Sequence, residues 1–234
     1  MRGRELEEIT PDDNSGTYYK YTLERVLILT EYQGRNMLIS LSVQNGRSEV
    51  GRKAAVIGKY ENWDYVYSGV PGTNLMLAGG AATYIYSSAS IIVLYEDAPG
   101  SRFTGYAMYR WMEAGWGGMN MVKDHHIIAG AERSFAGIKA FMESPDRPSA
   151  KEIASHAAKL NALDLAALQE QFKPYSVNVE EAAKTNSLLR SADFQKVVAH
   201  AGYGSSLTKE EIVAAMNVNF IKQKLGKPLL AGPL

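Results

Sequence analysis

The chain contains no cysteine, and its formal charges cancel. The missing cysteine excludes thiol nucleophiles, disulfide bonds, zinc-thiolate sites and iron-sulfur clusters. Because 25 Lys and Arg residues balance 25 Asp and Glu residues, the chain has no basic excess, and we expect no nucleic-acid partner. The 234 residues are 46% hydrophobic and 21% charged. A globular protein of this length buries roughly 70% of its unfolded surface.

The first residues lack the apolar core of a signal peptide. Met1-Arg-Gly-Arg-Glu-Leu-Glu-Glu is mostly charged, so we expect a flexible segment over residues 1–16. This start favours a cytoplasmic protein. A cell-envelope or periplasmic location is the alternative, if a native signal peptide has been removed.

Formal charge is also missing from the whole stretch between Tyr65 and Tyr95. Residues 75–95 are long enough for a membrane span, which needs about 20 apolar residues. Glycine and serine dilute the apolar content, however, and the two β-rich runs Tyr84–Tyr86 and Ile91–Tyr95 flank a serine-rich turn. Two buried strands are therefore the favoured interpretation, and a membrane span is the other.

The first half of the chain has the two-residue period of β-strands. Apolar residues alternate with polar ones from Tyr19 to Leu29 and again from Met37 to Val43, and Asn45-Gly46 is a favoured hairpin turn. Further strands are expected at 53–57, 63–67, 82–87, 90–95 and 103–112. Seven strands with short connections predict a mostly antiparallel sheet, curved or closed into a barrel.

The second half has the 3.6-residue period of helices. An apolar stripe predicts a long helix from Met121 that ends before Pro145. Capping boxes at Ser149 and Thr208 predict two helices, another short helix is expected at 164–172, and the segments 179–189 and 192–200 are expected to be helical. The fold class is therefore α+β, with an antiparallel sheet or barrel over 17–118 and four to five helices over 119–234, packed on the sheet or appended to it.

Arg25 interrupts the apolar face of the strand that begins near Tyr19. A charge on the inward face of a sheet needs a partner. Arg25 could anchor a ligand carboxylate or phosphate through its planar guanidinium, or it could pair with a carboxylate of a neighbouring strand.

Aromatic residues are concentrated in the first half of the chain. Twelve of the fourteen tyrosines and all three tryptophans precede residue 117. Aromatic side chains suit the wall of a ligand pocket, although they also fill ordinary β-sheet cores. The candidate pocket residues are Trp63, Tyr65, Tyr67, Tyr84, Tyr86, Tyr109, Trp111 and Trp116.

Two further motifs lie at the change from strands to helices. Gly115, Gly117 and Gly118 predict a sharp corner rather than a dinucleotide-binding loop, because the GxGxxG spacing is missing. The Asp124-His125-His126 run is a weak metal or general-base candidate, with Glu132 two turns further along the helix. Adjacent histidines on a helix point about 100° apart, so they do not form the usual metal-binding pair.

The sequence favours a non-catalytic protein that binds an apolar, lipid-like or aromatic small molecule in a Tyr/Trp-lined pocket of a curved sheet. Arg25 would hold an acidic group of that ligand. One alternative is a structural or interaction protein that forms a homo-oligomer through residues 65–95. Another is an enzyme that uses the Asp124-His125-His126 cluster. The residues identify no cofactor.

Overall fold

The computed structural model describes residues 1–11, 16–72, 81–185, 189–199 and 202–230. The chain divides into two compact units. The sheet unit comprises Met1–Thr10, Tyr18–Gly51 and Pro71–Ser134, and the helical unit comprises Pro11–Thr17, Arg52–Val70 and Phe135–Leu234.

Seven strands form one antiparallel sheet that is curved and not closed. The strands are β1 (Arg2–Ile9), β2 (Thr17–Tyr32), β3 (Arg35–Gln44), β4 (Arg52–Val56), β5 (Tyr65–Pro71), β6 (Thr83–Glu96) and β7 (Thr104–Trp116). Their order is β5-β4-β2-β3-β6-β7, and β1 pairs with β2. The expected α+β class with about seven antiparallel strands is confirmed.

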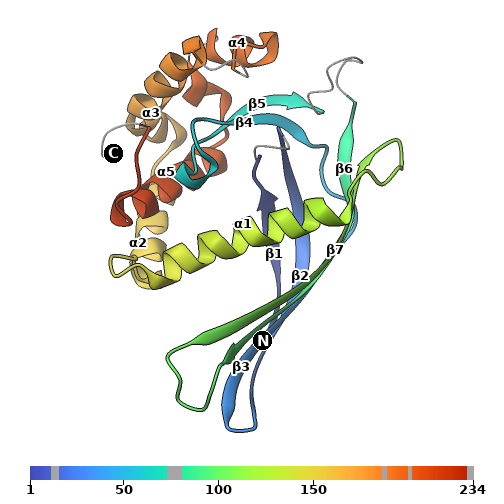
Figure 1. Cartoon of the computed structure of the whole chain (residues 1–234). Coiled ribbons are helices and arrows are strands. Elements are labelled where there is room, and N and C mark those ends of the chain that lie inside the picture. Colours follow the sequence, from blue (N-terminus) through green and yellow to red (C-terminus); the bar gives the residue numbers. More distant parts are fainter. Residues whose placement is uncertain (12–15, 73–80, 186–188, 200–201, 231–234) are drawn as a thin grey trace. The chain divides into compact units, whose positions relative to one another are not determined.

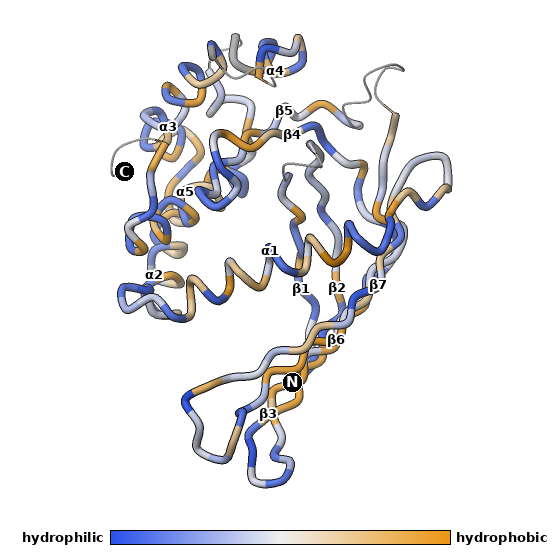
Figure 2. The backbone as a smooth tube through the Cα atoms, in the orientation of Figure 1, coloured by the Kyte–Doolittle hydropathy of each residue, from blue (hydrophilic) through white to orange (hydrophobic). Residues whose placement is uncertain are grey.

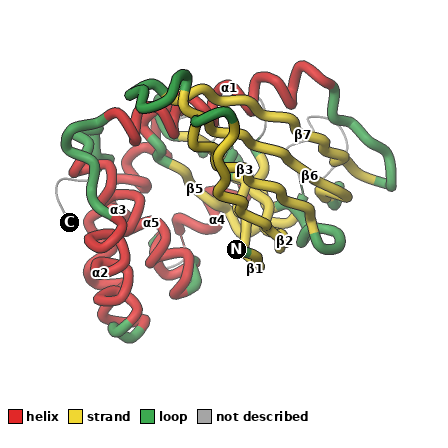
Figure 3. The backbone as a smooth tube through the Cα atoms, turned by 90° about the horizontal axis from the view of Figure 1, so that it is seen from below, coloured by secondary structure: helices red, strands yellow, loops and turns green. Residues whose placement is uncertain are grey.

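The sheet unit contains the long strands β2, β3, β6 and β7, which lie side by side in Figures 1 and 3. The turn between β2 and β3 consists of Gln33 and Gly34, both with positive φ. Two such residues suit the twist of a short hairpin. The predicted hairpin at Asn45-Gly46 is wrong, because β3 pairs next with β6 rather than with the strand that follows it.

A single strand, β6, replaces the two strands expected at 82–87 and 90–95. The serine-rich segment between them does not turn. It forms a register irregularity between Ile85 and Ser87, where β6 carries one more residue than β7. Residues 75–80 of the stretch weighed as a membrane span lie outside the described residues. No described helix has the length and apolarity needed to cross a membrane.

The sheet unit has a small apolar core on one side of its curved sheet. Tyr21, Leu23 and Ile85 are buried there. Partly buried residues from β1, β2 and β7 pack around them, namely Ile9, Tyr19, Met112 and Ala114. Residues 2–9, which were expected within the flexible segment 1–16, form β1 along one edge of β2; residues 12–15 of that segment lie outside the described residues.

The helical unit contains most of the buried apolar residues. Its helices are α2 (Ala150–Asn161), α3 (Leu165–Thr185), α4 (Ala192–Ala199) and α5 (Lys209–Lys224), with short 3-10 turns at Tyr60–Asn62 and Tyr203–Ser206. The long helix α1 (Asp124–Glu143) begins in the sheet unit and ends in the helical unit. The largest fully buried side chains around α3 belong to Leu168, Phe172, Val179, Phe194, Tyr203 and Ile212.

Both predicted capping boxes are present, at Ser149 of α2 and at Thr208 of α5. The break predicted at Pro174 is wrong, because α3 continues through this proline. The helices expected at 164–172 and 179–189 are therefore one, although residues 186–188 lie outside the described part. Phe172 and Tyr175 on either side of Pro174 are buried, and this packing outweighs the lost backbone hydrogen bond.

Candidate functional site

The sheet unit has two faces, which the strand register defines. In antiparallel strands, residues directly opposite one another share a face. One row consists of Arg25, Ser42, Ser90 and Arg110, and we call this side the Arg25 face. The neighbouring row consists of Glu24, Val43, Ala89 and Trp111, and we call this side the Trp111 face.

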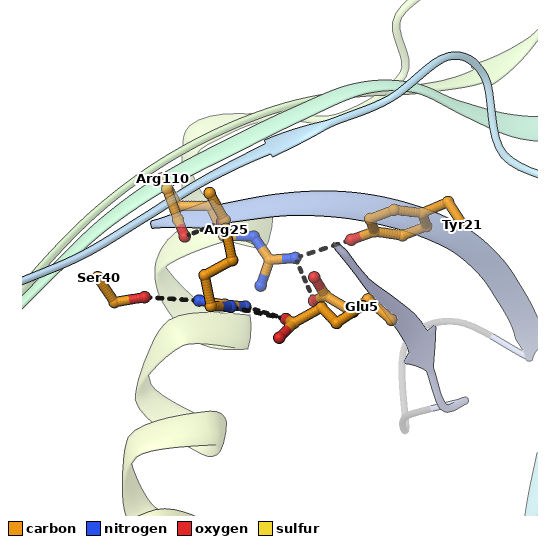
Figure 4. A network of polar contacts seen from close by, with 8 residues as sticks. Glu5, Tyr21, Arg25, Ser40 and Arg110 are labelled. Atoms are coloured by element: carbon orange, nitrogen blue, oxygen red, sulfur yellow. Dashed lines mark hydrogen bonds and ion pairs between the residues drawn. The ribbon is translucent and has the colours of Figure 1, made fainter. Parts of the chain in front are cut away.

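Arg25 lies on the inward face, as predicted, and it is paired. Its Nε donates a hydrogen bond of 2.7 Å to Glu5 of β1, and its Nη1 donates one of 2.6 Å to Ser40 (Figure 4). Nη2 also binds Glu5. The hydrogen bond to Glu5 raises the pKa of Arg25. This geometry matches the pairing that was the alternative to a ligand anchor, because the partner is a carboxylate of the adjacent strand.

A second arginine lies on the Arg25 face, and the sequence analysis did not identify it. Arg110 of β7 lies 3.5 Å from Glu7 and 3.5 Å from the hydroxyl of Tyr21. Its Nε is buried without a hydrogen-bond partner among the described residues. Burial raises the pKa of Tyr21 to about 12. Arg110 is two residues from both Met108 and Met112, so the two-residue period of a strand could have placed it on an apolar face. The same reasoning identified Arg25.

The Trp111 face carries a shallow groove of about 320 Å³. Its floor is formed by two adjacent rows of apolar residues from β2, β3, β6 and β7. Orange hydrophobic segments follow the same strands in Figure 2. The residues that line the groove are Arg2, Glu24, Val26, Leu41, Ser42, Val43, Ala89, Ser90, Ile91 and Trp111.

One end of the groove is charged. Arg2 donates a hydrogen bond of 2.7 Å to Glu24, and Arg4 lies 3.4 Å from the same carboxylate. The hydrogen bond from Arg2 lowers the pKa of Glu24. At the other end, Trp111 is 56% exposed, which is unusual for the largest apolar side chain.

The structure does not bring all the predicted pocket residues together. Trp63, Tyr65 and Tyr67 belong to the helical unit. There Lys227 lies over the Trp63 ring, and the backbone N–H of Tyr67 donates to the hydroxyl of Tyr203. These three aromatics therefore do not line the groove of the sheet unit.

The remaining aromatic candidates lie in the sheet unit. Tyr109 is on the Trp111 face, one row away from Trp111. The Arg47 guanidinium lies 4.0 Å from the Tyr84 ring, and the Tyr86 hydroxyl accepts a hydrogen bond from the backbone N–H of Gly118. Trp116 is opposite Thr83 at the far end of β7. Among the predicted pocket residues, Trp111 lines the groove, whereas Arg25 lies on the opposite face of the sheet.

His125 and His126 lie in the first turn of α1, and both are exposed. Their rings are 4.1 Å apart, and Nδ1 of His126 accepts a hydrogen bond from the Lys123 backbone. Glu132 is exposed as well. In the part of the chain that the structure describes, no group of three His, Asp or Glu side chains is arranged to hold a metal ion.

A buried ion pair in the helical unit also escaped prediction. Lys222 of α5 is 0% exposed, and its Nζ lies 2.5 Å from a carboxylate oxygen of Asp64, which is also buried. Burial lowers the pKa of Lys222 and raises the pKa of Asp64. The two residues are 158 positions apart, and nothing in the local pattern joins them.

Comparison with known proteins gives no further guide to function. No protein-family model matches the chain, and neither does any curated protein or solved structure.

Proposed function

We propose that the protein is a non-catalytic binding protein that holds an apolar small molecule in the groove of the Trp111 face. The observation that carries the proposal is the groove itself. Small-molecule sites are concave and mostly apolar, with volumes of about 300 to 1,000 Å³. The volume of about 320 Å³ lies at the lower end of this range.

The floor of the groove suits an alkyl chain or a flat ring. Val26, Leu41 and Ile91 lie in one row, and Val43 and Ala89 lie in the next. A ligand that covers these side chains removes apolar surface from water on both partners, and this is the main favourable term in such binding. Trp111 adds a large flat apolar wall beside the ligand.

The charged end of the groove favours a neutral polar group over a carboxylate. The carboxylate of Glu24 already pairs with the guanidinium groups of both Arg2 and Arg4. An acidic ligand would have to compete with Glu24 for these two arginines. A hydroxyl group can instead donate to Glu24 without breaking these pairs. The proposal therefore replaces the acidic ligand expected at Arg25 with a lipid-like or aromatic ligand that carries an uncharged polar end.

Isothermal titration calorimetry with decanol and decanoate tests this proposal on the full chain. We expect saturable binding of decanol, with one molecule bound per chain, and weaker binding of decanoate. Replacing Val43, which is 55% exposed on the groove floor, by lysine introduces a charge into the apolar site. V43K should weaken decanol binding at least about tenfold, which corresponds to 1.4 kcal/mol.

The matched control is L29K. Leu29 lies on the Arg25 face of the same sheet and is 83% exposed, so its replacement adds the same charge outside the groove. Circular dichroism should show that both variants retain the fold. Absence of decanol binding, or equal loss in V43K and L29K, would refute the proposal.

A further inference from the structure

The outer edge of β7 is an open surface of the sheet unit. Among the strands that the structure describes, β7 is the last of the sheet order and pairs with β6 alone. It is 13 residues long and contains neither proline nor lysine, and the register irregularity lies in β6. Proteins usually protect a long edge strand with one of these features or with a covering segment, because its free N–H and C=O groups invite another strand.

The hydrogen bonds of Ala114 show which residues of β7 point to this edge. Its N–H donates to the Asn120 side chain, and its C=O accepts from the N–H of Met121. Both groups therefore point away from β6. Because the direction alternates along a strand, the backbone groups of Met108, Arg110 and Met112 also point outward. Residues 120–121 cover only the end of the edge, and no described strand pairs with the remainder.

The side chains beside this edge are apolar on both faces. Tyr109 and Trp111 are 58% and 56% exposed on the Trp111 face, while Met108 and Met112 lie on the Arg25 face. Arg110 is the only charged residue between Thr104 and Met112, and it already contacts Glu7 of its own chain. A strand that pairs here must therefore be apolar on both faces and almost uncharged.

β7 itself meets this requirement. With Tyr109 on a twofold axis, Trp111 of one copy lies opposite Ala107 of the other, and Arg110 lies opposite Met108. Tyr109 then faces its own copy across the axis, the other large side chains face small or flexible ones, and no like charges are directly opposed. Outward-pointing Met108 and Arg110 become a hydrogen-bonded pair, which exchanges two N–H···O bonds. A shift of the axis to Arg110 would place two arginines opposite each other.

We propose that two copies of this chain pair through their β7 strands, antiparallel about a twofold axis at Tyr109. The resulting interface is isologous, and it continues the antiparallel sheet from one subunit into the other. This proposal does not depend on ligand binding in the groove. It also moves the expected homo-oligomer contact away from the β6 part of residues 65–95, because β6 is paired along both of its edges.

The lack of cysteine makes a direct test available. Opposed residues at a non-hydrogen-bonded antiparallel position have Cα atoms about 4.5 Å apart, within the range that a disulfide spans. Tyr109→Cys should therefore form a covalent dimer of twice the 25.7 kDa chain mass under mild oxidation. Phe103→Cys is the matched control, since Phe103 is 76% exposed but precedes β7. It should remain uncrosslinked under the same conditions.

Light scattering after size-exclusion chromatography provides the second readout. The unmodified chain should elute as a dimer, and Tyr109→Lys should raise the dimer dissociation constant at least about tenfold, because two like charges would meet on the axis. Phe103→Lys should leave this constant within about twofold, and circular dichroism should show both variants folded. A monomer at every concentration would overturn the proposal. So would a dimer that survives Tyr109→Lys, or crosslinking of Phe103→Cys as extensive as that of Tyr109→Cys.

Discussion

Replacing Lys222 by methionine should strongly destabilise the helical unit. Lys222 is fully buried, and its ammonium group lies 2.5 Å from the buried carboxylate of Asp64. Methionine has a similar volume but no charge, so the substitution leaves Asp64 ionised and unpaired at neutral pH. Breaking a buried ion pair in this way costs about 3–5 kcal/mol.

The pH dependence follows from the pKa of Asp64. Burial already raises this pKa above the ordinary value of 3.8, and loss of Lys222 removes the attraction that opposes the rise. In the variant, the folded state therefore binds the Asp64 proton more tightly than the unfolded state does. Its free energy of unfolding falls as the pH rises from about 3.8 through the folded pKa. The deficit relative to the parent chain should be largest at pH 7 and should shrink towards pH 4.5.

Urea unfolding followed by far-ultraviolet circular dichroism measures these free energies. The double variant D64L/K222M is the control, because it removes both charges at once. Apolar replacement of a buried pair is often neutral or stabilising. We therefore expect the double variant to recover most of the loss. A cost below about 1 kcal/mol for K222M, or a double variant as unstable as K222M, would refute the reasoning.

Two further predictions concern packing and helix propensity. Phe172→Ala should lower the free energy of urea unfolding by about 3–5 kcal/mol, because Phe172 is fully buried next to the rings of Tyr175 and Tyr203. The control is Val177→Ala on the exposed side of the same helix, which should lower this free energy by less than about 1 kcal/mol. Gly137→Ala should stabilise α1 by up to about 1 kcal/mol, since the added Cβ meets no atom within 4 Å and glycine is a poor helix former. Unfolding midpoints no higher than that of the parent chain would contradict the second prediction.

Local patterns predicted the fold class because they act over a few residues. The capping boxes at Ser149 and Thr208 depend on residues three positions apart, and both are present. The alternation from Tyr19 to Leu29 correctly placed Arg25 with Tyr21 and Leu23 on one face, since a regular strand alternates its side chains between two faces.

Features that depend on distant residues could not be predicted in the same way. Asn45-Gly46 is a favoured hairpin signal, yet β3 pairs with β6, which begins almost forty residues later. Pro174 would end an isolated helix, but buried residues on both sides of it hold α3 together. The residues next to Asn45-Gly46 do not determine which strand β3 pairs with, and those next to Pro174 do not determine that α3 continues.

The candidate site was only partly predictable for a related reason. Aromatic residues could be identified as a group, but their faces depend on strand register. Trp111 lines the groove, whereas Arg25 lies on the opposite face and Trp63 belongs to the helical unit. The Asp64–Lys222 pair depends on a contact between residues 158 positions apart, and one sequence gives no signal for such a contact.

Native mass spectrometry of the full chain with added decanol tests the central claim most directly. The account predicts a complex with one decanol molecule per 25.7 kDa chain, released on denaturation, and a much smaller bound fraction for V43K than for L29K. A chain that takes up no decanol, or equal uptake by these two variants, would contradict the claim that the groove of the Trp111 face binds an apolar molecule.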